Sequence, residues 1–196
     1  MANCAVFASG NGSNFQAVAE EVQKSEHNVV CLICDNPNAY VIERAQTVGI
    51  PHHIVPYRNR TREEAEKEIL SVLSDYEVDL IVLAGFMKLI TPTLLEPYKD
   101  RIVNIHPSLL PKYPGAHAID KSYDSKDKRL GITIHRIDTG MDTGPIILQK
   151  SFIRNGTETK EQIEEKIHTL EHIYYPIVVL NLLGAVSYRS ESIRRR

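Results

Sequence analysis

The sequence has few cysteines, and this scarcity excludes two kinds of structure. Three cysteines in 196 residues, at positions 4, 31 and 34, leave no disulfide framework. Cys31 and Cys34 have the C-x-x-C spacing of metal and redox motifs, but no second cysteine pair would complete a zinc site. Their segment, VVCLICD, also has the pattern of a buried strand, in which residues three apart point to opposite faces. We therefore interpret all three cysteines as core residues.

The chain also lacks a long apolar run and a strong excess of either charge. Its longest apolar stretches, such as DLIVLAGFMKLI at residues 79–90, are too short and too interrupted to span a bilayer. The formal net charge of −2 and the pI near 6.4 give no general electrostatic reason to bind nucleic acid or a membrane. No basic lead with a small-residue cleavage site precedes the first apolar run. We therefore expect a cytoplasmic protein without a nucleic-acid or membrane partner.

Repeats, linkers and low-complexity segments are missing as well. A chain of 196 residues can bury one sizeable core, whereas two full domains would be cramped. Its 42% hydrophobic and 24% charged residues are ordinary values for a globular protein. We predict a single domain over residues 1–186, followed at 187–196 by a basic tail, SYRSESIRRR, that frays in solvent. A nucleic-acid-binding arm is the less favoured interpretation of this tail.

Apolar runs and amphipathic stretches alternate over the first half of the chain. The expected strands are residues 3–9, 28–34, 52–56, 78–85 and 101–106. The expected helices are residues 14–24, 39–49, 61–76 and 91–100. The third of these helices is the most strongly marked, because Thr61 and Glu64 have the spacing of a capping box. This alternation predicts an α/β protein with a doubly wound, mostly parallel sheet flanked by helices.

The pattern changes after residue 106. Two strand-like runs, 130–138 and 144–153, are separated only by the short stretch TGMDT. This spacing predicts an antiparallel, hairpin-like extension towards the C-terminal end of the sheet. A long helical pattern at 159–185 follows and closes the domain.

The stretch ASGNGSNF, residues 8–15, directly follows the first expected strand. Gly10 and Gly12 permit a tight turn and a close backbone approach, while Ser13 and Asn14 suit the first turn of a helix, whose free N–H groups bind anions. The stretch lacks the third glycine of a dinucleotide fingerprint and the lysine of a P-loop. We therefore expect a loop that binds one terminal phosphate, and a turn without a ligand is the alternative.

A second polar motif, NIHPSLLPKYPGAH, occupies residues 104–117. Asn104 and His106 share one face of a strand, and an amide donor beside a titratable ring can stabilise an oxyanion and move a proton. A carboxylate from the later loop DTGMDTGP, residues 138–145, would orient the imidazole and favour its charged form. A metal would require further ligands. A polar strand end that satisfies a turn is the remaining alternative.

An amide, an imidazole and a carboxylate together suit the transfer of a small acyl group through a tetrahedral intermediate. The sequence shows no obvious enzyme nucleophile. Ser108 is the nearest hydroxyl, but it lies in a proline-flanked turn and lacks the G-x-S-x-G context. Direct attack by a substrate amine is therefore the more economical mechanism.

Four motifs, GNGSNFQA, LAGFMKLI, NIHPSLLPKYPGAHA and DTGMDTGPIILQ, occur in this order over essentially the whole chain. With them the sequence resembles the phosphoribosylglycinamide formyltransferases, members of the folate-dependent formyltransferase family. The resemblance implies formyl transfer from the co-substrate 10-formyltetrahydrofolate to the amine of glycinamide ribonucleotide (5-phosphoribosylglycinamide) in de novo purine biosynthesis, without a metal. NIHPSLLP and the later D-x-G loop are common to all folate-dependent formyl transferases and hydrolases. GNGSN, which suits a ribose 5-phosphate, is therefore the discriminating motif.

The resemblance also assigns roles to individual residues. Asn104 would hold the formyl oxygen, His106 would transfer the proton, and Asp142 would raise the basicity of His106. The residues implied for the nucleotide substrate are Gly12, Ser13, Asn14, His168 and Glu171, the last of these on the ribose hydroxyls. The residues implied for the folate are Arg62, Met87, Lys88, Leu89, Ile90, Asn104, Asp138, Thr139, Gly140, Met141 and Asp142.

Some positions depart from the family pattern or stay open. Lys88 stands where arginine is common, which would weaken contact with the glutamate tail of the folate. Asp138 is interpreted as a turn residue. The roles of His117, His135 and His168 stay open, and so does the choice between monomer and homodimer.

Three other functions would use parts of the same pattern. A formyltetrahydrofolate hydrolase would keep the three catalytic residues and use water, but such enzymes usually carry an additional N-terminal domain. A methionyl-tRNA formyltransferase would need a basic C-terminal tRNA-binding domain. A noncatalytic binder of folate or of a phosphate ligand would leave the Asn/His/Asp combination unexplained.

Overall fold

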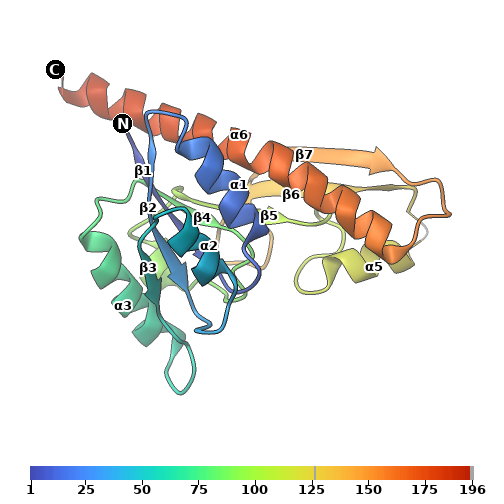
Figure 1. Cartoon of the computed structure of the whole chain (residues 1–196), viewed down its shortest axis with the longest axis horizontal. Coiled ribbons are helices and arrows are strands. Elements are labelled where there is room, and N and C mark those ends of the chain that lie inside the picture. Colours follow the sequence, from blue (N-terminus) through green and yellow to red (C-terminus); the bar gives the residue numbers. More distant parts are fainter. Residues whose placement is uncertain (126, 195–196) are drawn as a thin grey trace.

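A seven-stranded sheet organises the chain, in the order β3-β2-β1-β4-β5-β6-β7 (Figure 1). The computed structural model describes residues 1–125 and 127–194, and of residues 189–194 it describes the backbone alone. The strands are β1 (Asn3–Ala8), β2 (Asn28–Cys34), β3 (His52–Ile54), β4 (Leu80–Leu83), β5 (Ile102–His106), β6 (Arg129–Arg136) and β7 (Ile146–Ile153). The first five strands are parallel to one another, whereas β6 is antiparallel to β5 and β7 to β6. The predicted fold class is confirmed.

Helices cover both faces of this sheet. They are α1 (Ser13–Val22), α2 (Val41–Thr47), α3 (Arg62–Ser74), α4 (Pro92–Leu95), α5 (Ala118–Asp124) and α6 (Lys160–Arg194). The expected capping box is present at the start of α3, between Thr61 and Glu64. Helix α5 was not expected, because its seven residues are too few to show a clear apolar period.

The last helix differs from the expected one in its length. It continues past residue 185 to Arg194, so its backbone includes most of the predicted tail. The side chains of residues 189–194 and all of residues 195–196 lie outside the described part. Fraying of the tail therefore stays a prediction.

Two apolar layers, one on each face of the sheet, form the core. One layer joins the sheet to α1, α2 and α6, and the other joins it to α3 and α4. Cys4 and Cys34 lie in the first layer and Cys31 lies in the second. Burial raises the pKa of the Cys31 thiol to about 12 and also raises the pKa of the other two. The C-x-x-C pair therefore points to opposite faces, as the interpretation of core cysteines requires.

Helix α6 lies along the sheet and crosses several strands (Figure 1). By length and composition alone, its segment Lys160–Tyr188 would be able to cross a bilayer. However, Ile163, Ile167 and Tyr175 are fully buried against the sheet, and the hydroxyl of Tyr175 lies 2.7 Å from the carbonyl oxygen of Leu83 in β4. A helix that packs on a protein core meets the same criterion, so the criterion does not by itself indicate a membrane span.

The strand order reverses between β1 and β4. From β1 the chain moves outward through β2 to β3, and it then returns to the other side of β1 with β4. In open α/β sheets, ligands bind at such a reversal, beyond the carboxyl ends of the strands. The glycine-containing turn follows β1, the GFMKLI loop follows β4, and His106 ends β5. The fold therefore gathers the sequence motifs along one edge.

Candidate active site

The turn after β1 is tied directly to the loop after β4. The N–H of Ser9 donates to the carbonyl oxygen of Gly85 at 3.2 Å, and the hydroxyl of Ser9 accepts from the N–H of Met87 at 2.9 Å. Gly12 precedes α1 with a positive φ of 81°, a backbone conformation that favours glycine. The first bond of the helix runs from the N–H of Gln16 to the carbonyl oxygen of Gly12. The preceding N–H groups, of residues 13–15, form the open end of α1.

Three of the five residues expected around a nucleotide meet beside this helix end. One carboxylate oxygen of Glu171 accepts from the side-chain amide of Asn14 at 3.0 Å and lies 2.8 Å from Nδ1 of His168. Glu171 is buried, and its bond to His168 raises the pKa of that ring. The side-chain oxygen of Asn14 is buried without a partner among the described residues. A polar cluster therefore joins α1 to α6 close to the glycine turn.

Asn104 and His106 lie on β5 and are separated by one residue, as the period of a strand requires for a shared face. The antiparallel pairing of β5 with β6 places Asn104 opposite His135 and His106 opposite Thr133. Nδ2 of Asn104 lies 3.2 Å from Nε2 of His135. Nδ1 of His135 lies 2.9 Å from the carbonyl oxygen of Arg136, so this nitrogen carries a proton. Nδ2 of Asn104 carries two N–H groups and His135 can take at most one of them, so at least one is left for a ligand oxygen.

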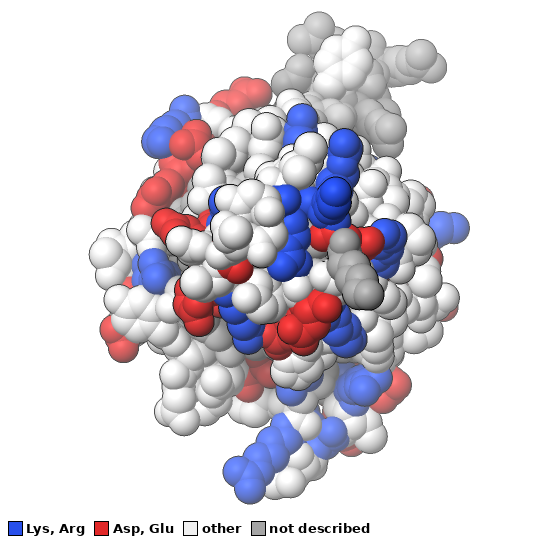
Figure 2. Space-filling model, turned by 90° about the vertical axis from the view of Figure 1, so that its right-hand side faces the viewer, with Lys and Arg blue, Asp and Glu red and all other residues white. Residues whose placement is uncertain are grey.

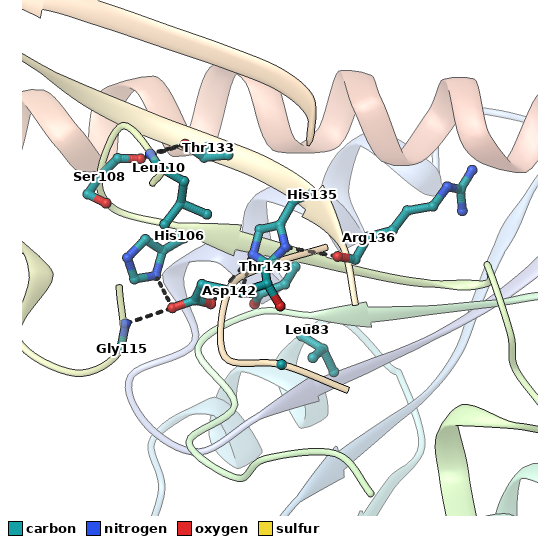
Figure 3. A network of polar contacts seen from close by, with 12 residues as sticks. Leu83, His106, Ser108, Leu110, Gly115, Thr133, His135, Arg136, Asp142 and Thr143 are labelled. Carbon is teal, nitrogen blue, oxygen red and sulfur yellow. Dashed lines mark hydrogen bonds and ion pairs between the residues drawn. The ribbon is translucent and has the colours of Figure 1, made fainter. Parts of the chain in front are cut away.

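Asp142 lies between the two histidine rings (Figure 3). Its carboxylate is 3.4 Å from Nδ1 of His106 and 3.6 Å from Nε2 of His135, and it accepts from the N–H of Gly115 at 2.7 Å. The contact with His135, the N–H of Gly115 and the nearby His106 ring hold the pKa of Asp142 below its usual value. The residue adopts a positive φ of 56°, an uncommon conformation that aims its side chain inward from the loop. The structure thus brings together Asn104, His106 and Asp142.

The ring of His106 has an oxygen acceptor at each nitrogen. Nε2 lies 2.8 Å from the carbonyl oxygen of Tyr113, and Nδ1 faces Asp142. Because a carbonyl and a carboxylate only accept, a ring that carries both protons satisfies both contacts. The ring is almost completely buried, so its orientation is well defined by these two partners.

The proline-containing segment 107–117 is held against β6 and β7. The buried hydroxyl of Thr133 donates to the carbonyl oxygen of Ser108 at 2.7 Å and accepts from the N–H of Leu110 at 3.0 Å (Figure 3). The side-chain amide of Gln149 bonds to the carbonyl oxygen of Leu110 at 2.8 Å. These bonds fix the backbone that supplies the Tyr113 carbonyl to His106. Ser108 itself donates into the segment, to the carbonyl oxygen of Lys112, and this bond fits a structural role.

Sequence reasoning did not assign His135 and Gly115 to the site. His135 was left open between a supporting and a structural role, and its position between Asn104 and Asp142 gives it a supporting one. The register of the β5–β6 pair places His135 opposite Asn104, and this register could not be predicted from the sequence. Gly115, with a positive φ of 74°, gave no signal. His117 instead is exposed and pairs with Asp120, away from Asp142.

The residues expected around a folate differ in how far their side chains are exposed to a ligand. Met87, Leu89 and Met141 are exposed apolar side chains, with 75%, 42% and 51% of their surface accessible, as a ligand-facing rim would require. Ile90 is half-buried against the core, and Arg62 is exposed at the start of α3. Thr139 and Gly140 are exposed in the same loop as Met141.

Two folate-side residues have partners within the protein. Asp138 accepts from the N–H of Gly140 at 3.0 Å and from the hydroxyl of Thr143 at 2.7 Å, which is the pattern of a turn residue. Lys88 lies 3.2 Å from the buried carboxylate of Asp35 and 5.8 Å from the ring centre of Tyr57. The charge of Lys88 is therefore already paired at the end of β2.

Within the described residues, no group of three or more His, Cys, Asp or Glu side chains is placed to hold a metal ion.

A hollow of about 280 Å³ lies beside α5, and His117, Asp120, Lys160 and Glu164 contribute to its lining. Asn104, His106 and Asp142 are not part of that lining. The candidate active site is therefore at the carboxyl ends of the strands, and not in this hollow. Around the end of the molecule seen in Figure 2, Lys and Arg side chains are interspersed with Asp and Glu.

Comparisons with known proteins agree with this geometry. Residues 2–179 match the family model described as formyl transferase. The chain is 46% identical to the phosphoribosylglycinamide formyltransferase of Bacillus subtilis (strain 168) over 187 residues, which cover 94% of this chain and 96% of that protein. It is 34% identical to the Escherichia coli (strain K12) protein of the same name over 90% of this chain and 85% of that one. The crystal structure of glycinamide ribonucleotide transformylase 1 from Geobacillus kaustophilus superposes with a TM-score of 0.90 at 44% identity, covering 94% of this chain and 100% of that one.

The chain therefore belongs to the formyl transferase family, the class that its sheet and its matches define. Its near-full-length relatives in that family are phosphoribosylglycinamide formyltransferases, so the resemblance predicted from the four motifs is confirmed. The chain is an enzyme of this kind, a formyl transferase of purine biosynthesis.

Proposed function

We propose that this chain transfers the formyl group of 10-formyltetrahydrofolate to the amine of glycinamide ribonucleotide. The observation that carries the proposal is the position of Asp142, which contacts the rings of His106 and His135 beside Asn104. Such a set can stabilise an oxyanion on the formyl carbon and move a proton between the nitrogen atoms that attack and leave this carbon. The family relationship supports the formyl group as the unit transferred.

The glycine turn and the cluster of Asn14, His168 and Glu171 support a nucleotide at one end of the site. The open N–H groups of residues 13–15, with Gly12, would bind the 5′-phosphate. Glu171 would accept hydrogen bonds from the ribose hydroxyls, and His168, whose pKa is raised, would add a positive charge near the phosphate.

The exposed apolar residues Met87, Leu89 and Met141 support the other end, where the folate would lie. We assign to the folate the segments 87–90 and 138–142, together with Arg62. The pairing of Lys88 with Asp35 leaves little of its charge for a glutamate tail, in line with the weak contact expected at this position.

The reaction follows from these placements. The acceptor amine attacks the formyl carbon, so a carbon–nitrogen bond forms and the carbonyl electrons move onto the formyl oxygen. The free N–H of Asn104 donates to this oxyanion. The electrons on the oxyanion then re-form the carbonyl bond as the bond between the formyl carbon and N10 of the folate breaks; His106 delivers a proton to N10, and the proton lost by the amine restores the ring. Nε2 of His106 would exchange the carbonyl oxygen of Tyr113 for the substrate, while Asp142 stays on Nδ1.

We further propose that the enzyme works in the cytoplasm as a single domain of residues 1–186, as a monomer or homodimer. Its partners would be the two small substrates, without a metal, nucleic acid or membrane. The small-molecule chemistry of the family supports this assignment.

A comparison of folate turnover with and without acceptor tests the function. The phosphate turn and Glu171 would deliver the amine at high effective concentration, so glycinamide ribonucleotide should strongly accelerate folate release and yield formylated nucleotide. An acceptor without the 5′-phosphate should lose much of that acceleration, because remote binding energy is used at the reacting centre. The readouts are folate absorbance and chromatography of the nucleotide. Rapid deformylation that ignores the nucleotide would instead indicate a hydrolase.

A further inference from the structure

Arg44 on α2 is bonded to the glycine turn through one residue of that turn. Its Nε donates to the carbonyl oxygen of Asn11 at 2.8 Å, and a terminal nitrogen donates to the side-chain oxygen of Asn11 at 3.0 Å. Its other terminal nitrogen contacts the side-chain oxygen of Gln16 in the first turns of α1. One guanidinium thus joins the turn to the helix whose open end follows it.

The first residue of α2, Val41, also contacts the glycine turn. The N–H of Val41 donates to the carbonyl oxygen of Gly10 at 3.1 Å. A β-carbon added to Gly12 would lie 2.5 Å from Cβ and 2.9 Å from Cα of Val41, so the backbone of the turn packs directly against this residue. Arg44 lies one turn further along α2. Residues 10–12 are therefore held on one side by Val41 and bonded by Arg44.

The partners of Arg44 leave its charge uncompensated. Asn11 and Gln16 are neutral acceptors, and Arg44 takes part in none of the ion pairs in the described part of the chain. The guanidinium also lies 4.9 Å from the ring centre of Tyr40, which holds it in place without neutralising it. A fixed positive charge beside an open helix end raises the potential that an anion meets there.

We propose that Arg44 is a positioning residue of the phosphate turn. It holds residues 10–12 in the shape that opens the N–H groups of α1, and its charge attracts the phosphate. This proposal rests on the proposed nucleotide site. It assigns the role to a residue on α2, a helix in which sequence reasoning had placed no functional residue.

The test compares Arg44→Met with Arg101→Met. Arg101 is a matched control, because it also lies over a tyrosine ring, 4.7 Å from the centre of Tyr98, and also donates to a backbone carbonyl, that of Pro97. In Arg44→Met, the KM for glycinamide ribonucleotide should rise ~10-fold to ~100-fold, while kcat and the KM for the folate change less than ~2-fold. Arg101→Met should leave all three unchanged. An equal rise in both KM values, or none in a folded protein, would overturn the proposal.

Binding of ribose 5-phosphate, measured by calorimetry at several salt concentrations, gives a readout that does not need the reaction. The salt dependence should flatten in Arg44→Met and persist in Arg44→Lys, which keeps the charge but not the two-point bond to Asn11. Arg44→Lys should bind with intermediate affinity. An unchanged salt dependence in both variants would contradict the proposal. Failure of the wild-type enzyme to formylate the nucleotide would reject the proposed function alone, since these binding results would still decide the role of Arg44.

Discussion

At the scale of single residues, the chemistry depends on one carboxylate with several partners. Asp142 contacts His106, His135 and the N–H of Gly115, and these contacts lower its pKa. The carboxylate therefore stays ionised at pH values below the ordinary range of an aspartate. Protonation of Asp142 should thus limit activity only under strongly acidic conditions.

We predict that His106→Ala and Asp142→Asn each lower kcat by ~10² to ~10⁴-fold without unfolding the protein. The first removes the proton carrier, and the second removes the charge that orients it. Steady-state kinetics measures the losses, and circular dichroism checks the fold. The double variant should lose far less than the product of the two single losses, because residues that act as a unit are not additive. Near-wild-type turnover in folded His106→Ala would exclude the proposed mechanism.

At the scale of elements, short helices position the loops that carry the site. Helix α2 packs against the glycine turn, and α3 is hydrogen-bonded to the start of α4. The link between α3 and α4 is Glu66, which is fully buried and accepts from the N–H of Thr91 at 2.8 Å and the N–H of Leu94 at 3.2 Å. Thr91 directly follows the GFMKLI loop, so Glu66 anchors that loop at its far end.

We predict that Gly12→Ala lowers the free energy of unfolding by ~2–4 kcal/mol, through the strain of a positive φ and the clash with Val41. The same variant should weaken nucleotide binding and leave folate binding nearly unchanged. Urea unfolding and calorimetry measure the two effects. The sequence predicted only that Gly12 permits a close backbone approach, whereas the structure shows that an added β-carbon would first meet Val41 at the start of α2.

Gly10→Ala is the matched control for this prediction. A β-carbon at Gly10 would meet no atom within 4 Å, and Gly10 lies in the same turn. Its stability should stay within ~0.5 kcal/mol of wild type. Equal destabilisation by both variants would show that the clash of the added β-carbon with Val41 does not cause the loss of stability in Gly12→Ala.

We predict that Glu66→Ala costs ~3 kcal/mol of unfolding free energy, because it leaves the buried N–H of Thr91 without an acceptor and removes one of the two acceptors of the N–H of Leu94, which also bonds to the carbonyl oxygen of Thr91. The KM for the folate should rise as the GFMKLI loop loses its anchor, and the KM for the nucleotide should rise less. Chemical denaturation and steady-state kinetics are the measurements. Glu63→Ala, an exposed change on the same helix, should alter stability by less than ~0.5 kcal/mol. A Glu66 variant as stable as Glu63→Ala would contradict the role given to this carboxylate.

At the scale of the whole molecule, the carboxylate of Glu158 joins α6 to the segment before it. Glu158 accepts from the N–H groups of Asn155 and Gly156, both at 3.0 Å, and from Nζ of Lys166 at 2.8 Å. The bond from Lys166, together with these N–H groups, lowers the pKa of Glu158 to about 2. Because the pKa is lower in the folded protein, this contribution to stability is complete above about pH 4.5 and disappears as the pH falls towards 2.

We predict that Glu158→Gln lowers the Tm by about 2–4 °C at pH 7, and that this difference from wild type shrinks as the pH falls from 5 to 2. Protonated Glu158 resembles glutamine, so the two proteins should converge in acid. Differential scanning calorimetry over this pH range measures the convergence. A constant difference in Tm at all pH values would show that the ionised form of Glu158 is not what matters.

Also at the whole-molecule scale, sequence and tertiary structure determined different properties. Strand and helix order, the parallel half and the antiparallel extension followed from local apolar periods, which depend on neighbours in the chain. Asn104 and His106 were predictable for the same reason, because residues two apart on a strand must share a face. Asp142 and the folate-side loop could be assigned only through the family resemblance.

Contacts between distant segments were decided by the tertiary structure. His135 reached Asn104 through the register of β5 with β6, and Gly115 reached Asp142 through the path of a segment without periodic pattern. Arg44 and Glu66 occupy ordinary positions of amphipathic helices, and their roles arise from which loop each helix packs beside. Helix α5 and the full length of α6 were likewise settled by packing. The physical reason is common to these cases: periodicity records which face of an element is buried, and only the folded chain determines what that face meets.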